Sequence, residues 1–275
     1  MLGSDVLAAL VASGHEVESA DLPDFDLSDP ASVTGRLLEE QPAFDACVNC
    51  AAYTAVDAAE THVEEATAIN TLGPGYLARA CAAAGTQLVH ISTDFVFDGH
   101  KSFPYTEEDT PNPLQVYGRT KLEGEEAVLA GNPNSIILRT SWLYGPSGKS
   151  FPRTMLEAAR AGKPLKVVRD QIGTPTYTAE LARVIVAALE RKIWPGLYHA
   201  AGADVLSWFE FARRVLDAAD DTRGYLVEPI LSWEWPTPAV RPRYSALAAD
   251  KLNQAGIAPI QPLAASLKDF LARLS

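Results

Sequence analysis

The stretch Leu88-Val89-His90-Ile91-Ser92-Thr93-Asp94 carries the clearest structural signal in the chain, because an apolar run ends abruptly in hydroxyl groups and an acid. The run predicts a buried strand over residues 87–91. Strand and helix patterns alternate on both sides of it, which favours a mostly parallel sheet covered by helices. In such doubly wound α/β folds, ligands bind at the carboxyl ends of the strands. The polar residues after Ile91 therefore mark the expected site.

The elements expected around this strand follow from hydrophobic spacing and from caps. Towards the N-terminus we expect helices at 2–13, 30–40 and 63–84, and strands at 15–20 and 45–50. Towards the C-terminus we expect helices at 117–130, 151–161, 179–191, 207–219 and 262–274, and strands at 135–138, 165–168 and 197–200. Three prolines predict a loop over 233–242.

The start of the chain lacks the apolar strand and glycine-rich turn with which doubly wound nucleotide-binding folds open. Met1-Leu2-Gly3-Ser4-Asp5 resembles the tail of such a turn, with Gly3 as its last glycine, and leads directly into a helix. The absent strand normally lies mid-sheet, where its loss would leave backbone groups unpaired. We therefore expect that the N-terminal strand is missing, and that roughly 10 to 20 residues precede Met1.

Composition restricts the class of protein. Hydrophobic residues make up 47% and charged residues 21%, which are globular values, and no apolar run has the length of a membrane span. The net charge of −12 argues against nucleic acid as a partner. Cys47, Cys50 and Cys81 form no disulfide framework, and Cys47 and Cys50 would point to opposite faces of a strand. We expect a cytoplasmic protein that binds neither membrane nor nucleic acid.

The segment Tyr117-Gly118-Arg119-Thr120-Lys121 predicts acid–base chemistry. Residues four apart share one face of a helix, so Tyr117 and Lys121 point the same way. A lysine ammonium beside a phenol lowers the phenol pKa from its usual value of about 10. Such a phenol can give a proton to a ketone oxygen while hydride reaches the carbon. Thr93, at the end of the preceding strand, is placed to hydrogen-bond the same oxygen.

Ser92-Thr93-Asp94 followed by Tyr117-x-x-x-Lys121 resembles the extended short-chain dehydrogenase/reductases, which have a Rossmann-type fold. Longer strings narrow the resemblance to the dTDP-4-dehydrorhamnose reductases. These strings are residues 49–57, 92–99, 139–145, 170–176 and 236–242. Phe95 stands where tyrosine is usual in these proteins, and Cys50 where alanine is usual.

The resemblance implies the last step of dTDP-L-rhamnose synthesis, in which NADPH or NADH reduces the 4-keto group of dTDP-4-dehydro-β-L-rhamnose. Tyr117 would donate the proton, Lys121 would tune its pKa and bind the nicotinamide ribose, and Thr93 would polarise the carbonyl. The residues expected to contact the substrate are Thr93, Asp94 and Trp142. The residues expected along the cofactor are Gly3, Asp26, Leu27, Ala51, Ala52 and Tyr53, together with Tyr117 and Lys121.

Structural roles remain open for several of these residues. Asp94 could cap a turn, Trp142 could fill the core, and Asp26 could be a solvated loop acid. Arg241 and Arg243 are candidates to bind a diphosphate, or are solvated loop arginines. The histidines show no metal spacing, and His90 and His199 lie in strand patterns typical of core positions.

The organisation expected is a single NAD(P)-binding reductase domain, 1–275. Its nucleotide-binding core covers about 1–145 and 164–200, and a smaller substrate cap covers about 146–163 and 201–275. Some relatives hold a divalent metal at a dimer interface, so a homodimer and Mg²⁺ are included, with no residue assigned to the metal. Two alternatives stay open: a related sugar-nucleotide epimerase or reductase, and a non-catalytic regulatory subunit of the same family. Ser19-Ala20-Asp21 does not distinguish a preference for NADPH from one for NADH.

Overall fold

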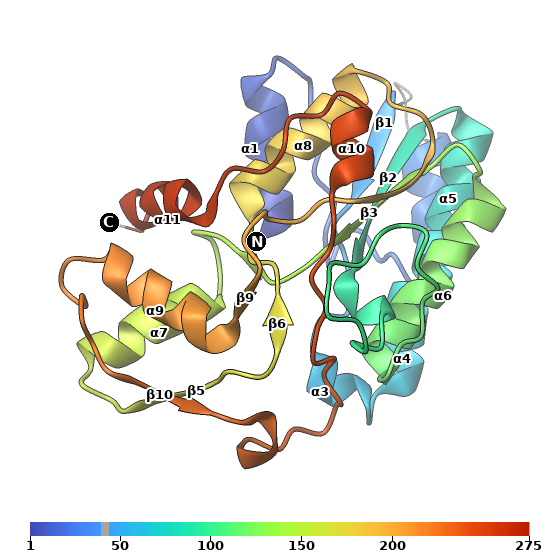
Figure 1. Ribbon diagram of the computed structural model, residues 1–275. Helices are drawn as coiled ribbons and strands as arrows, with labels where there is room; N and C mark the ends of the chain where they lie inside the picture. The colour runs from blue at the N-terminus through green and yellow to red at the C-terminus, as the bar shows by residue number, and fades with distance from the viewer. Residues whose placement is uncertain (40–43, 275) are drawn as a thin grey trace.

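Within residues 1–39 and 44–274, the main sheet has four parallel strands and is covered by helices on both faces, which confirms the doubly wound α/β class (Figure 1). The computed structural model describes residues 1–39 and 44–274. In spatial order the strands are β1 (Ala46–Asn49), β2 (Gln87–Thr93), β3 (Ile136–Thr140) and β8 (Gly196–His199).

Alternate residues of the buried strands pack on opposite faces of this sheet, as a repeat of two residues requires. The helices on one face are α1 (Leu2–Ala12), α8 (Thr178–Glu190) and α10 (Asp250–Gln254). Those on the other are α2 (Pro30–Thr34), the π-helical turn η1 (Gly35–Glu39), α5 (Gly73–Ala84) and α6 (Val116–Gly131). On β2, Val89 and Ile91 pack with the first group and Leu88 with the second.

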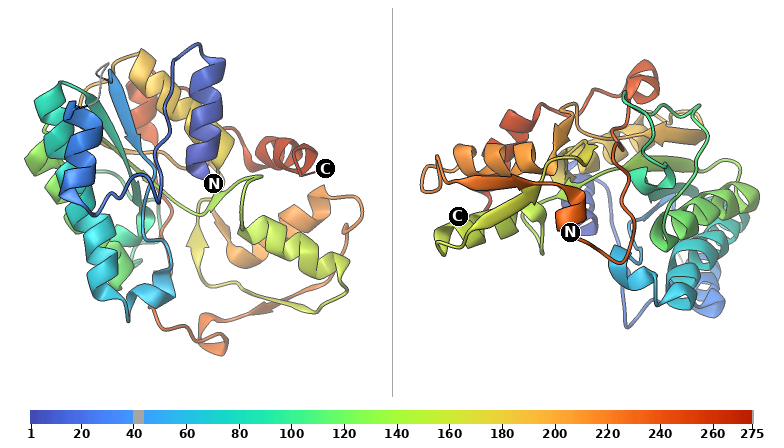
Figure 2. Two further views of the ribbon diagram at one scale, coloured as in Figure 1. Left: turned by 180° about the vertical axis from the view of Figure 1, so that it is seen from behind. Right: turned by 60° about the horizontal axis from the view of Figure 1, so that its bottom comes forward.

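A second body lies beside the sheet (Figures 1 and 2). It consists of α7 (Phe151–Arg160), α9 (Trp208–Ala218), α11 (Leu263–Ala272) and the parallel pair β5 (Leu165–Val168) and β10 (Val227–Ile230). Its buried aromatic centre contains Tyr144, Tyr177, Phe211 and Phe270. Residues 164–168, expected with the nucleotide-binding core, therefore pack in this second body.

Short elements connect the two bodies. The pair β4 (Leu143–Tyr144) and β7 (Thr176–Tyr177) is parallel, and the pair β6 (Ile172–Gly173) and β9 (Leu206–Ser207) is antiparallel. The remaining turns are α3 (Val56–Ala59), α4 (Val63–Thr67), the π-helical η2 (Ala68–Leu72) and the 3₁₀ turns η3 (Asp94–Val96) and η4 (Ser232–Glu234). η4 lies in the region predicted to be a loop.

The predicted strand at 15–20 is wrong, because these residues form no ladder with any described strand. A strand is stable only when a neighbouring strand satisfies its backbone hydrogen-bonding groups, so the alternating pattern of residues 15–20 is not sufficient to form a strand. The predicted helix at 30–40 forms as α2 and η1 as far as residue 39, and residue 40 lies outside the described residues. The expectation that a further strand precedes residue 1 stays a prediction.

Across residues 1–39 and 44–274, no helix is both long and apolar enough to cross a membrane.

Candidate functional site

The predicted site begins where β2 ends, at two buried polar residues. Thr93 and Asp94 are only 6% and 2% exposed. The Thr93 hydroxyl accepts a hydrogen bond from the Phe95 N–H at 3.2 Å, so it caps the 3₁₀ turn η3. Asp94 accepts a hydrogen bond from the Ser245 hydroxyl. Burial raises the pKa of Asp94 to about 7, and its hydrogen bonds with Ser245 and Thr93 oppose that rise.

Helix α6 brings Tyr117 against this turn. The Tyr117 ring packs edge-on against Phe95, with ring centroids 5.9 Å apart. Gly118 makes the close approach possible, because a Cβ there would lie 2.1 Å from the Phe95 carbonyl oxygen. The first turn of the helix is capped from outside, since the Val116 N–H donates to Glu60 Oε1 at 2.9 Å.

Burial dominates the acidity of Tyr117. It raises the pKa of the phenol to about 12, hydrogen bonding with Thr93 acts in the opposite direction, and the charge of Asp94 raises the pKa further. The sequence-based expectation that Lys121 lowers this pKa is therefore wrong for the structure as described. The phenol is held in its protonated form at neutral pH.

Lys121 is 1% exposed and turned towards β2. Its Nζ donates to the Ile91 carbonyl oxygen at 2.7 Å and lies 3.3 Å from Nε2 of His90. Burial lowers the pKa of Lys121 to about 8, while Glu125 and Cys50 raise it. Lys121 shares a helix face with Tyr117, as predicted, but its hydrogen-bond partners belong to the strand.

The segment Ala51-Ala52-Tyr53 follows β1 and is held by two buried asparagines. The Ala51 N–H donates to Asn49 Oδ1 at 3.0 Å, and the Tyr53 N–H donates to Asn70 Oδ1 at 2.9 Å. Asn70 also donates to the Tyr53 carbonyl and to the Thr120 hydroxyl on α6. The segment is thereby fixed to the helix that carries Tyr117 and Lys121.

The first turn of α1 meets the same region. A Cβ on Gly3 would lie 3.7 Å from Cβ of Cys50, the residue before Ala51. Gly3 and Ala51 are exposed, and Cys50 lies close enough to Lys121 to influence its pKa. Gly3, residues 51–53 and Lys121, which are all expected along the nucleotide, therefore converge around Cys50 at the carboxyl ends of β1 and β2. This arrangement fits a dinucleotide lying along the edge of the sheet.

Asp26 and Leu27 lie farther along the chain, before α2. The Asp26 carboxylate accepts hydrogen bonds from the Ser28 N–H and hydroxyl at 2.8 and 2.7 Å, which lower its pKa. Leu27 is 6% exposed and packs in the cluster beneath α5. The Asp26 N–H donates to the Ser32 hydroxyl, and Ser32 lines a surface cavity of about 490 Å³ with Asp24 and Phe25.

Trp142 lies between the main sheet and the second body, in a backbone conformation that is rare for a bulky residue. Its φ is 44°, in the left-handed region. Its indole stacks on Trp208 with ring centroids 3.5 Å apart. A Cβ on Gly173 would lie 2.5 Å from the same indole, so glycine leaves it room. Such over-determined strain is typical of functional positions.

An ion pair behind the site was not predicted from the sequence. Arg139 on β3 donates to both carboxylate oxygens of Glu125 on α6, at 2.9 and 2.6 Å, and Ser92 donates to Glu125 as well. The two charged side chains are 3% and 5% exposed. No spacing rule joins residues on a helix and a strand, so only the fold brings them together.

The loop arginine Arg241 binds a partner within the chain. Its guanidinium donates to both oxygens of Asp57 at 2.9 and 2.8 Å, which lowers the pKa of Asp57. This pair joins α3 to the loop before α10.

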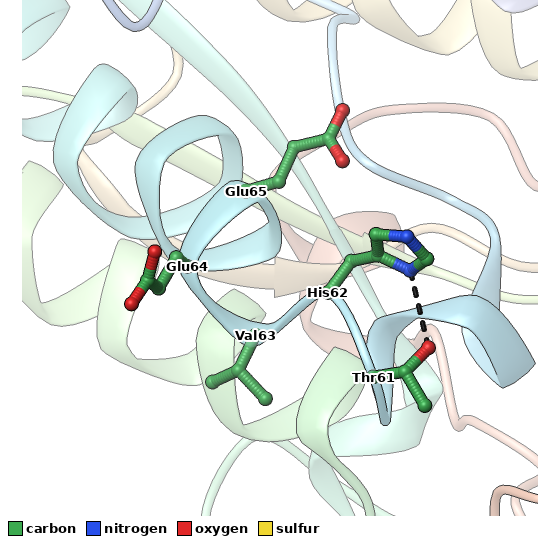
Figure 3. Close-up of a pocket in the computed structure, with 5 residues that line it drawn as sticks. All are labelled: Thr61, His62, Val63, Glu64 and Glu65. Atoms are coloured by element: carbon green, nitrogen blue, oxygen red, sulfur yellow. Dashed lines mark hydrogen bonds between the residues drawn. The ribbon is translucent and has the colours of Figure 1, made fainter.

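Another hollow, of about 400 Å³, is formed by the consecutive residues 61–65 alone (Figure 3). There the Thr61 hydroxyl lies 3.1 Å from His62 Nδ1, and the side chains of Glu64 and His62 point apart. No predicted site residue lines it.

Within the described ranges 1–39 and 44–274, no group of three or more His, Cys, Asp and Glu side chains could hold a metal ion. No set of described residues therefore supports the expectation of Mg²⁺.

Comparisons with known proteins agree with this geometry. A family model described as the RmlD substrate binding domain matches residues 1–275. A dTDP-4-dehydrorhamnose reductase of Mycolicibacterium smegmatis is 40% identical over 276 residues, covering 99% of this chain and 82% of that protein. The crystal structure of a dTDP-4-dehydrorhamnose reductase from Clostridium acetobutylicum matches with a TM-score of 0.94 at 38% identity, over 99% of this chain and 95% of that one. The reductase of Bacillus anthracis, solved in complex with NADP, matches with a TM-score of 0.93 at 33% identity, over 98% and 95% of the two chains. The chain therefore belongs to the RmlD substrate binding domain family, together with these dTDP-4-dehydrorhamnose reductases.

Proposed function

We propose that this protein is an NAD(P)H-dependent reductase of a dTDP-linked 4-keto sugar, converting dTDP-4-dehydro-β-L-rhamnose to dTDP-L-rhamnose. The observation that carries the proposal is the grouping of Thr93, Tyr117 and Lys121 at the carboxyl end of β2 in a chain of this family. The relatives' names supply the substrate class, and the Bacillus anthracis complex supports the cofactor class.

The bound nicotinamide would supply the hydride to the carbonyl carbon. Tyr117 then gives its phenolic proton to the carbonyl oxygen, which leaves the product as an alcohol. The resting phenol carries the proton that it must donate, because its pKa lies well above neutral pH. Thr93 would hydrogen-bond the same oxygen and stabilise the charge that develops on it.

The remaining site residues are assigned to binding. Lys121, Gly3 and Ala51-Ala52-Tyr53 would line the cofactor, with Asp26 and Leu27 towards its adenine end. Asp94 and Trp142 would contact the sugar nucleotide. The main-sheet body would bind the cofactor and the second body the substrate, within one reductase domain. A homodimer stays a prediction.

Kinetics of two variants test the assignment. Replacing Tyr117 with phenylalanine keeps the ring packing on Phe95 but removes the proton, and should lower kcat by about 10²- to 10⁴-fold. Thr93→Val should lower kcat by about 10²-fold. A Phe209→Leu control changes an aromatic residue of α9 and should leave kcat close to wild type. Unchanged turnover in Tyr117→Phe would exclude the mechanism.

A further inference from the structure

Behind Lys121 runs a continuous chain of buried polar groups that the proposed reaction does not use. The Ala51 N–H lies 3.0 Å from Asn49 Oδ1, Asn49 Nδ2 lies 3.1 Å from His90 Nδ1, and His90 Nε2 lies 3.3 Å from Lys121 Nζ. Asn49, His90 and Lys121 are 5%, 0% and 1% exposed, so the protein itself has to satisfy these groups. The chain links the expected cofactor segment to the lysine of the site.

The direction of each hydrogen bond follows from one fixed donor. A main-chain N–H can only donate, so the Asn49 atom facing Ala51 is its oxygen. The Asn49 amide nitrogen therefore faces His90 and donates to Nδ1. Burial is the larger cause that holds the pKa of His90 well below its usual value, so the ring is neutral and carries one proton. That proton must be on Nε2, because Nδ1 is already an acceptor.

The consequence falls on Lys121. An ammonium group has donors only, so it would set an N–H against the Nε2–H of His90. A neutral amine has a lone pair that accepts from Nε2–H, and it can still donate to the Ile91 carbonyl oxygen at 2.7 Å. We propose that His90, fixed in its Nε2–H tautomer by Asn49, is a positioning residue that disfavours the ammonium form of Lys121.

The other groups around Lys121 oppose this effect in part. Glu125, one turn along α6, and Cys50, at the end of β1, both favour the ammonium form. Burial is the larger influence and acts in the same direction as His90. The inference concerns the site of the proposed reductase and rests on that function only for its consequence, a Lys121 that can gain or lose a proton during turnover.

Nuclear magnetic resonance of the whole chain tests the proposal without substrate or cofactor. The ¹⁵N shifts of the His90 ring should report the Nε2–H tautomer in the unmodified protein. The side-chain carbon next to Nζ of Lys121, assigned with Lys121→Arg, should titrate with a pKa of about 8, below that of the exposed lysines. A neutral ring protonated on Nδ1 would overturn the proposal, even if the protein proves to be the expected reductase.

Two variants test the causal link. Asn49→Ala frees Nδ1, so the ring proton can move there and Nε2 can accept from an ammonium. His90→Phe removes the Nε2 donor altogether. Each should raise the pKa of Lys121 by about half a unit or more. His199→Phe is the matched control, because His199 is equally buried on β8 but its Nδ1 faces the Tyr105 carbonyl. An unchanged Lys121 titration in both test variants, each checked for a cooperative unfolding transition, would also overturn the proposal.

Discussion

Replacing Glu125 with glutamine should destabilise the protein by about 3–5 kcal/mol, because Arg139 would become a buried charge without a counter-ion. The pair is bidentate, with Nε–Oε1 and Nη2–Oε2 distances of 2.9 and 2.6 Å, and both side chains are almost fully buried. The guanidinium also lies over the Phe97 ring, 5.1 Å from its centroid, so it cannot turn to solvent without leaving that contact.

Urea unfolding at neutral pH measures this cost directly from the free energy extrapolated to water. The control is Glu228→Gln, which breaks the Lys166–Glu228 pair, whose side chains are 55% and 59% exposed. This exposed pair should contribute less than about 1 kcal/mol. Adding Arg139→Met to Glu125→Gln should recover much of the lost stability, since no buried charge then remains. A loss below about 1 kcal/mol for Glu125→Gln alone would refute the reasoning.

Three further predictions follow from the geometry of the site. Gly173→Ala places a Cβ 2.5 Å from the Trp142 indole, so it should cost about 1–3 kcal/mol of stability. It should also raise KM for the sugar nucleotide more than it lowers kcat, and an unchanged KM would contradict a role for Trp142 in binding. Burial raises the pKa of Asp94 from 3.8 to about 7, so the folded state holds an extra proton between those values and stability should fall as pH rises through that window. Thermal unfolding of Asp94→Asn should show a flatter pH dependence there, and equal slopes for variant and wild type would count against the assignment. Asp57→Asn removes the partner of Arg241. Because the pair lowers the pKa of Asp57, the variant should be less stable than wild type above pH 3.8, and its stability should approach that of wild type as the pH falls further. A stability difference that persists in strong acid would contradict this prediction.

Much of the fold could be predicted from local pattern. The helix of residues 2–13 and the strand around His90 form because their apolar residues repeat at the spacing of the element. Gly85, with φ of 74°, closes the long helical segment as predicted. The strand predicted at 15–20 does not form, because strand formation depends on a paired neighbour as well as on its own alternation.

The site divides in the same way. Thr93 and Asp94 could be placed at the site because ligands bind at the carboxyl ends of the strands, and Tyr117 and Lys121 could be placed on one helix face because they are four residues apart. The directions of the pKa shifts of Tyr117 and Lys121 could not be predicted, because burial is the largest cause of both shifts and depends on tertiary packing. His90 was correctly expected in the core, but its contact with Lys121 depends on how α6 packs across β2.

The roles of Glu125 and Trp208 could not be predicted for a related reason. Each acts through a partner in a distant element, Arg139 on β3 for the first and Trp142 for the second. Only tertiary packing creates such contacts, and no motif in the sequence marks them.

The most direct test of the proposed function is the stoichiometry of NADPH oxidation with dTDP-4-dehydro-β-L-rhamnose, followed by nicotinamide absorbance and by chromatography of the dTDP-sugars. A reductase should oxidise one NADPH for each dTDP-L-rhamnose formed, and Tyr117→Phe should lose most of both signals together. Sugar conversion without net NADPH consumption would identify an epimerase instead. Absence of both signals, with a partner enzyme retained on purification, would favour the regulatory subunit and contradict the account.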